Sequence, residues 1–437
     1  MERKVFLSFL GATRYLPSKY YVNKENIIEN RFVQIASLFS HCQDFGKDDY
    51  IYIFTTPTAK KKNWEDFFWE DKKETTKGLK SELDKSNLKC NYEAIDIDEE
   101  TSEEKIWETF DIVFKKLKNY DEIVFDITHG FRSSPMLLMV LINYAKFLKN
   151  ITVRKILYGA YEARNENNET KIWDLTNFAL LQDWTSASNE FLNFGNSTSI
   201  SKLTKNEAIP FIKSNTEKKE IAKKISLFAS ELNKFTTDIS TVRGYEIYLG
   251  KTFVNIRNII KEIEQLNFIQ PLGPLLNAIS KKIEPFKANY IFNILKIVDF
   301  CINHNMTQQG ITFLQEAIIS FVLKNNNLEW FFSDSGNKKT IINNRDLASS
   351  VLNYIENIKN PSFVKEGWNW KYWDKQIIDT LLQDVFVSKI SDIYSKLGKF
   401  RNDINHGGLI EKFNSDKFLN TLKKSYSDII ELISEDD

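Results

Sequence analysis

The segment Ile123–Pro135, with the sequence IVFDITHGFRSSP, limits the possible folds of this chain more than any other feature. It begins with a short run of apolar and β-branched residues, which is typical of a buried strand. A polar loop follows, and Pro135 opens a long apolar stretch that has the spacing of a helix. The order of strand, polar loop and helix is that of an open α/β sheet, in which ligands bind beyond the carboxyl ends of the strands.

The polar loop of this segment carries side chains that suit an anionic ligand. Thr128 and Ser133 offer hydroxyl groups, and Arg132 offers a fork of donors that matches a phosphate. In the alternative interpretation, Asp126 and Thr128 only cap the turn and His129 fills space. Both interpretations remain open at the level of these residues alone.

Strands and helices alternate through the first 160 residues. We expect strands at Val5–Leu10, Tyr50–Phe54, Cys90–Ile97, Ile123–Ile127 and Val153–Tyr158, and helices at Asn30–Phe39, Glu103–Leu117 and Met136–Leu148. Such alternation predicts an open, mostly parallel sheet of Rossmann type.

Three other expected strands also end in loops that contain glycine or hydroxyl residues. Gly11–Tyr15 follows the first strand, Thr55–Thr58 the second, and Gly159–Glu162 the last. The first of these loops has the same combination of glycine, hydroxyl and cation as the loop after Ile127, so the two loops can share one ligand. At Thr55 and Thr56, a capped turn is as good an interpretation as contact with a ligand.

The chain from Asp183 onwards is expected to be helical, because apolar residues recur there at helical spacing while glycine and proline become scarce. The clearest helices are Lys218–Phe235, Val254–Leu266 and Asn289–Cys301. We expect connections at Gly195–Ser201 and Pro271–Pro274, and a loop over Asn325–Asn344.

Length and composition limit the class of protein. A chain of 437 residues is too long for a single core and predicts two or three domains. Lys+Arg and Asp+Glu both number 59, so any nucleic-acid site must be local. Three scattered cysteines suggest neither a disulfide framework nor a zinc cluster, which favours a reducing, cytoplasmic setting. We recognise no signal peptide and no apolar run of membrane-spanning length.

Near the end of the sequence, charged and amide side chains are crowded into six residues. Arg401 and His406 are five residues apart, Asn402 and Asn405 lie between them, and Gly407-Gly408 ends the expected helix. This set offers a cation for a phosphate and a proton carrier near neutral pH. In the alternative interpretation, the two cations only complement the negative end of the helix dipole.

Both halves of the sequence resemble a known family. The first half is similar to the CARF domain of CRISPR-associated Csx-type proteins, and Arg401-x4-His406 with Asn402 resembles the active-site motif of a HEPN ribonuclease domain. The CARF resemblance rests on these segments: Gly11-Ala12-Thr13, Thr55-Thr56, Asp126-x-Thr128-His129-Gly130-x-Arg132, Trp173-Asp174-Leu175-Thr176 and Asp183-Trp184.

The resemblance implies a CARF–HEPN ribonuclease of type III CRISPR systems, with a CARF domain over residues 1–185, a helical connecting region over 186–300 and a HEPN helical bundle over 301–437. It implies a homodimer or higher homo-oligomer whose CARF domains bind cyclic oligoadenylate, with the cyclic tetraadenylate preferred over the hexamer. The expected ligand-binding residues are Gly11, Ala12, Thr13, Thr55, Thr56, Asp126, Thr128, His129, Gly130, Phe131, Arg132, Ser133 and Tyr161.

The activity that the resemblance implies is cleavage of single-stranded RNA without a metal or other cofactor. The 2′-OH of the RNA attacks and leaves a 2′,3′-cyclic phosphate, while His406 transfers protons and Arg401 stabilises the charge, with Asn402 beside them. Two alternatives are a ring nuclease that degrades its own cyclic oligoadenylate at the CARF loops, and a sensor without catalysis that recruits a partner. The intact Arg401, Asn402 and His406 argue against a decayed site.

Overall fold

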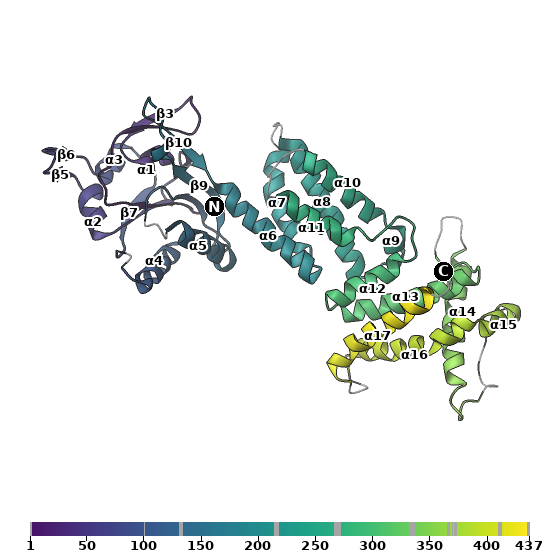
Figure 1. Ribbon diagram of the computed structural model, residues 1–437. Helices are drawn as coiled ribbons and strands as arrows, with labels where there is room; N and C mark the ends of the chain where they lie inside the picture. The colour runs from purple at the N-terminus through teal and green to yellow at the C-terminus, as the bar shows by residue number, and fades with distance from the viewer. Residues whose placement is uncertain are drawn as a thin grey trace. The chain divides into compact units, whose positions relative to one another are not determined.

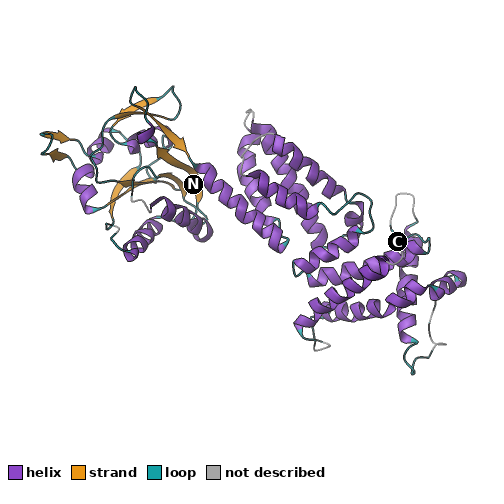
Figure 2. Ribbon diagram, viewed as in Figure 1, coloured by secondary structure: helices purple, strands orange, loops and turns teal. Residues whose placement is uncertain are grey.

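The computed structural model describes residues 2–99, 101–130, 134–213, 218–265, 272–331, 337–364, 368, 370, 374–409 and 413–434. The chain divides into two compact units, Met1–Gln182 and Asp183–Asp437. The first unit is a mixed α/β domain and the second consists of helices (Figures 1 and 2). The predicted fold class, an α/β domain followed by a helical region, is therefore confirmed.

The first unit is built on a sheet of eight strands in the order β3-β2-β10-β9-β8-β1-β4-β7. The strands are β1 (Lys4–Leu10), β2 (Ser18–Tyr21), β3 (Ile27–Asn30), β4 (Tyr50–Thr55), β7 (Asn91–Asp96), β8 (Glu122–Asp126), β9 (Thr152–Gly159) and β10 (Glu169–Asp174). The five strands from β9 to β7 are all parallel. A separate hairpin pairs β5 (Phe67–Trp69) with β6 (Glu74–Thr76).

Helices cover both faces of the sheet, so its central strands are buried on both sides. Phe6 and Leu10 of β1 face a core that includes α1 (Val33–His41) and α3 (Leu79–Lys85). The alternating residues of β1 face a second core with α4 (Glu103–Lys116) and α5 (Ser134–Lys149). This double burial explains why β1 appears in the sequence as a continuous apolar run. Short α2 (Pro57–Ala59), η1 (Lys60–Trp64) and η2 (Tyr161–Ala163) complete the unit.

The structure adds three strands to the sheet that the sequence did not predict. β2, β3 and β10 extend the sheet beyond β9, where β10 is antiparallel to β9 and parallel to β2. These strands have four to six residues, and β2 and β3 alternate buried or half-buried with exposed positions. Their short, partly polar sequences lack the apolar run that identifies β1 or β8.

The second unit contains only helices among its described elements. They are α7 (Thr198–Lys213), α8 (Lys218–Ser240), α9 (Gly244–Leu249), α10 (Lys251–Gln265), α11 (Leu272–Ile283), α12 (Asn293–Asn303), α13 (Thr307–Asn325), α14 (Lys338–Asn357), α15 (Lys375–Gln383), α16 (Val385–Asn405) and α17 (Ser415–Ser434). α6 (Thr176–Phe194) begins in the first unit and runs into the second. In the described part of the chain, no helix is long and apolar enough to span a membrane.

Three helices begin inside segments that were predicted as connections, of which residues 271 and 332–336 lie outside the described residues. α7 begins at Thr198, whose backbone N–H donates to Asn196 Oδ1 at 2.9 Å, so the predicted Gly195–Ser201 connection was too long. α11 begins at Leu272, so Pro274 lies in a first helical turn, where proline is tolerated. α14 begins at Lys338 behind the cap Asn337, which shortens the predicted loop over Asn325–Asn344.

The predicted domain boundaries differ from the division into units. The first unit ends at Gln182, whereas the sequence prediction placed the boundary after residue 185. α12 runs continuously through residue 300, where the prediction divided the helical part. The subdivision into a connecting region and a HEPN domain stays a prediction.

A buried ion pair joins the start of β1 to the start of β8. Arg3 Nε and Nη2 donate to the two carboxylate oxygens of Asp121 at 2.9 and 2.6 Å. Asp121 also accepts from the Lys118 backbone N–H at 2.6 Å, and its side chain is 1% exposed. The pair fixes the end of the sheet opposite to the carboxyl ends of the strands.

We expect Asp121→Ala to destabilise the first unit by about 3–5 kcal/mol, because the change leaves the Arg3 guanidinium largely buried without its carboxylate. Pulse proteolysis in urea measures the free energy of unfolding. The matched control is Asp98→Ala, which removes an exposed partner of Lys105 and should cost at most about 1 kcal/mol. Equal losses in the two variants would contradict the assignment of a structural role to Asp121.

Candidate functional site

A cavity of about 400 Å³ lies beyond the carboxyl ends of β1, β8 and β9. After β7 at one edge of the sheet, the chain returns to the other side of β1 to form β8. The cavity therefore lies at a topological switch point, the usual ligand site of an open α/β sheet. It is lined by Thr13, Arg14, Tyr15, Leu16, Tyr20, Arg31, Thr128, His129, Tyr158, Gly159, Tyr161 and Glu162. We call it the strand-end cavity.

Thr128 joins two of the loops that form the strand-end cavity. Its hydroxyl donates to Asp126 Oδ1 at 2.5 Å and accepts from the Gly159 backbone N–H at 2.7 Å. Ser8 Oγ donates to the other oxygen of Asp126 at 3.2 Å. A Cβ atom on residue 159 would lie 2.5 Å from Cγ2 of Val33 in α1. Only glycine therefore lets the end of β9 lie this close to α1. The loops after β8 and β9 are thus held at a fixed separation.

The loop after β1 is held by its own Tyr15 and by Asn63 from outside it. The Tyr15 hydroxyl accepts from the Gly11 backbone N–H at 2.6 Å. Asn63 in η1 donates through Nδ2 to the carbonyl oxygens of Gly11 and Thr13, at 2.8 Å each. The Tyr15 ring stacks on His129 with centroids 4.3 Å apart, which connects this loop to the loop after β8.

Two guanidinium groups line the strand-end cavity. Arg14 pairs with Glu74, while Arg31 donates to Asn63 Oδ1 at 3.2 Å and to the Lys77 carbonyl at 3.1 Å. Burial, followed by the positive charge of Arg14, lowers the pKa of Arg31. An anionic ligand would reduce the repulsion between the two cations, so the cavity is suited to phosphate groups.

The other titratable side chains of the cavity wall are mostly neutral. Burial lowers the pKa of His129 to about 4, so its imidazole is uncharged at neutral pH. Burial also raises the pKa values of Tyr15 and Tyr20, which keeps their hydroxyls protonated. Together with Tyr158 and Tyr161, these rings provide aromatic faces beside the guanidinium groups. The combination suits a ligand that has planar bases and phosphates.

The structure brings some of the predicted ligand-binding residues together. Four of them line the strand-end cavity: Thr13, Thr128, His129 and Tyr161. Four others lie in or beside the loops that form it, namely Gly11, Ala12, Asp126 and Gly130. Phe131, Arg132 and Ser133 lie outside the described residues.

The other two predicted ligand-binding residues, Thr55 and Thr56, are buried at the end of β4 and do not line the cavity. Thr56 Oγ1 accepts from the Ala59 backbone N–H at 3.3 Å and caps α2. This geometry is that of the capped turn considered as an alternative in the sequence.

Several side chains of the cavity were not predicted from the sequence. Tyr20 comes from β2, and Arg31 comes from the residue pair between β3 and α1. Neither position follows one of the apolar strands from which the site was inferred. Asn63 reaches the loop after β1 from 50 residues further along the chain. Asn63 closely follows the polar Thr55–Thr58 loop, so its position suggested a place near a strand end. Its hydrogen-bond partners in the loop after β1 could not be inferred from the sequence.

In the second unit, Arg401, Asn402 and His406 lie at the carboxyl end of α16. Gly407 and Gly408 have φ angles of 67° and 69°, and their N–H groups donate to the Ile404 and Asp403 carbonyls at 3.0 and 2.9 Å. This pair of bonds is a Schellman motif, with His406 as the C-cap. The predicted glycine stop of the helix is therefore confirmed.

The three predicted catalytic side chains differ in exposure and direction. Asn402 and His406 are exposed, and Arg401 is half-buried. Residues four apart share a helix face, as Asn402 and His406 do, whereas residues five apart differ by about 140° around the axis. Arg401 and His406 of one chain therefore point to different sides of α16. In the described residues, no three His, Cys, Asp or Glu side chains are grouped so that they could hold a metal ion.

Asp126 should make the stability of the first unit depend on pH. Burial raises its pKa to about 6, above its ordinary value of 3.8, although Thr128 and Ser8 donate to it. The stability that protonated Asp126 contributes is complete below about pH 4 and is lost as the pH rises through 6. Asp126→Asn keeps the acceptor for Thr128 and does not titrate.

We therefore expect the variant to gain about 2–3 kcal/mol relative to the wild type between pH 4 and pH 7. Hydrogen exchange of the β1 and β8 amides in both proteins measures this difference. A difference that stays constant across this range would show that Asp126 ionises as it does in the unfolded chain.

Comparison with known proteins places the first unit in a family. Residues 5–162 match the family model described as "CRISPR system endoribonuclease Csx1, CARF domain". CRISPR-associated protein MJ1674 of Methanocaldococcus jannaschii is 30% identical over 188 residues, which are 40% of this chain and 27% of that protein. The matched region is thus about a quarter of the length of this curated relative.

Among solved structures, Csm6 of Enterococcus italicus bound to cyclic hexa-2′-fluoro-hexa-dAMP aligns over 98% of this chain and 93% of that chain. The TM-score is 0.44 and the sequence identity is 11%.

The strand-end cavity thus lies within the region that matches the CARF model, and its loops after β1 and β8 come from segments on which the sequence resemblance rests. Residues 5–162 thus form a domain of the CARF family, and the helical unit lies outside this match.

Proposed function

We propose that the protein is an endoribonuclease of type III CRISPR defence that cyclic oligoadenylate activates and that needs no metal. The observation that carries this proposal is the strand-end cavity, which combines guanidinium groups with neutral aromatic side chains inside a CARF domain. A cyclic oligoadenylate offers phosphates to the cations and adenine bases to the aromatic faces.

A ring of adenylates is larger than one cavity, and we propose that a second copy of the chain completes its site. α5 follows the loop after β8 directly and carries a row of exposed apolar side chains. Met136 is 74% exposed and Phe147 is 84% exposed, with Val140 and Tyr144 between them at helical spacing. Pairing two such rows would cover them and bring two strand-end cavities close together.

For cleavage we propose that two copies of α16 form one site. The His406 imidazole suits proton transfer to and from the reacting oxygens, and Arg401 suits the charge that develops on the phosphorane oxygens. Because these side chains lie on different sides of α16, Arg401 of one copy and His406 of the other can face one phosphodiester. Asn402 shares the face of His406 and can orient the RNA backbone.

Activation requires that the ligand binds the productive state of the dimer more tightly than the unproductive state. α6 is the element that continues from the CARF domain into the helical unit, so it is the direct covalent route for this bias. Cyclic tetraadenylate is our preferred activator and cyclic hexaadenylate the next.

We expect Arg31→Ala to weaken cyclic oligoadenylate binding by about tenfold, because one charge-assisted hydrogen bond to phosphate is lost. Calorimetric titration with rings of three to six adenylates measures both the affinity and the preferred ring. Arg154→Ala is the matched control, since Arg154 pairs with Asp44 and does not line the cavity. Unchanged affinity in Arg31→Ala would move the site away from the strand-end cavity.

We expect His406→Ala to abolish cleavage of single-stranded RNA while ligand affinity stays within about twofold of wild type, because His406 has no place in the cavity. A fluorogenic RNA assay with and without cyclic tetraadenylate measures the rate. The matched control is Asn405→Ala, an exposed neighbour that should stay within about twofold of wild type.

Three results of this assay would change the proposal. Cleavage that persists in His406→Ala would exclude the α16 site. Wild-type cleavage that is equally fast without any oligoadenylate would exclude activation. Turnover of the cyclic ligand, measured by chromatography of the same reactions, without RNA cleavage would favour a ring nuclease.

A further inference from the structure

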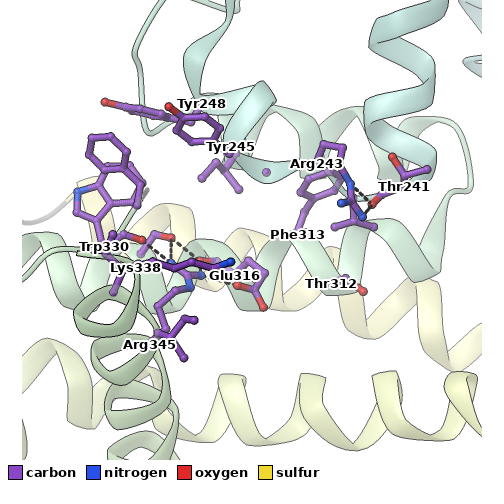
Figure 3. A pocket seen from close by; sticks show the side chains of 17 residues that line it. Thr241, Arg243, Tyr245, Tyr248, Thr312, Phe313, Glu316, Trp330, Lys338 and Arg345 are labelled. Carbon is purple, nitrogen blue, oxygen red and sulfur yellow. Dashed lines mark hydrogen bonds and ion pairs between the residues drawn. The ribbon is translucent and has the colours of Figure 1, made fainter. Parts of the chain in front are cut away.

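A second cavity, of about 470 Å³, lies within the helical unit between α9, α13 and α14 (Figure 3). Its volume is in the range of small-molecule sites, about 300–1,000 Å³. Buried Phe313, Ile294 and Ile341 give it an apolar part of its lining. Neither the CARF site nor α16 contributes to its lining. We call it the aromatic cavity.

One side of the aromatic cavity is a group of four aromatic rings. Tyr248 lies 5.0 Å from Trp330 and 4.8 Å from Phe331, measured between ring centroids. Tyr245 lies nearly parallel to Phe331, with centroids 6.4 Å apart and 22° between the planes. An ordinary satellite core would bury these rings, but Tyr245 is 41% exposed. The group therefore leaves ring surface within reach of a planar ligand.

The opposite side of the cavity carries a guanidinium group in a fixed position. Figure 3 shows Arg243 beside Thr241 there, with Trp330 and Tyr248 across the cavity. Arg243 Nε and Nη2 donate to the Thr241 carbonyl at 2.8 and 2.6 Å. Val242, between them, has a φ angle of 54°, a left-handed conformation that β-branched residues rarely adopt. A strained turn thus holds Arg243 at the edge of the cavity.

The charges along the cavity favour an anionic ligand. Its lining contains three cations, Arg243, Lys338 and Arg345, against one carboxylate, Glu316. Arg345 pairs with Glu316 and also donates to the Trp330 carbonyl at 2.8 Å, so this pair mainly fixes the wall. Arg243 and Lys338 are exposed at the rim, and their charges are available to a phosphate.

We propose that the aromatic cavity binds one nucleotide, with the base against the aromatic group and the phosphate at Arg243. The nucleotide is either free or one unit of a single-stranded RNA, since both present the same base and phosphate. The binding does not depend on the proposed activator or on cleavage.

The test measures binding directly, in a His406→Ala background so that an RNA probe stays intact. The probes are adenosine and uridine monophosphates and a six-nucleotide single-stranded RNA, titrated by calorimetry. Tyr245→Ala and Arg243→Ala should each weaken binding by about tenfold, since one stacking surface or one phosphate contact is lost. Lys339→Ala, which removes an exposed cation beside Lys338 that does not line the cavity, should stay within about twofold.

Each outcome decides the proposal. Binding of the oligonucleotide with no binding of the monophosphates, sensitive to Tyr245 and Arg243, assigns the cavity to an RNA chain. Binding of the monophosphates with the same sensitivity assigns it to a free nucleotide. If no probe binds, or if both variants bind like the parent while their thermal melting is unchanged, the proposal is wrong. Loss of cleavage by wild-type protein would not affect these results, because cleavage is not measured.

Discussion

The parallel alignment of β1, β8 and β9 is the constraint on which the candidate ligand site depends. Their carboxyl ends meet at one edge of the sheet, so the loops that follow them converge. Convergence alone would leave the loops free to move, but the Thr128 hydroxyl bonds both Asp126 and the Gly159 N–H. Because these bonds are partly buried, they fix the loops more firmly than fully exposed bonds would. The cavity thus has a rigid rear wall before any ligand arrives.

In α16, the residues that pack in the core and the candidate catalytic residues lie in different parts of the helix. The first four turns of α16 bury residues at helical spacing, among them Phe386, Ile390, Tyr394 and Leu397. The candidate catalytic residues stand in its last turn and at its C-cap, where backbone carbonyls are already satisfied by the Gly407 and Gly408 N–H groups. The core therefore holds the helix while its end can face a substrate. The hydroxyls of Tyr394 and Ser349 form a hydrogen bond of 2.8 Å, which connects α16 to α14. α14 also carries Arg345, which lines the aromatic cavity.

How much of this structure the sequence could predict depended on how local each signal was. The central strands and the loop at Thr128 were predicted because apolar runs and turn residues act within a few positions of the chain. β2, β3 and β10 were missed because four to six partly polar residues form strands only when a partner strand is present, and β2 joins the sheet through β10, which lies far along the chain. Asn63 and Arg31 were missed as parts of the site for the same reason. Their roles arise from contacts with residues between 32 and 52 positions away.

The protein has no net charge, yet two of its cavities carry cations that suit an anionic ligand. With 59 cationic and 59 anionic side chains, the surface has no overall field that would hold nucleic acid without specificity. Each cavity instead combines guanidinium groups with aromatic rings in its lining, Arg31 with Tyr161 in one and Arg243 with Tyr248 in the other. A site of this kind contacts few phosphates, so its affinity depends less on counterion release and more on stacking and placed donors. For the nucleotide ligands that we propose, selectivity would then come from shape rather than from charge.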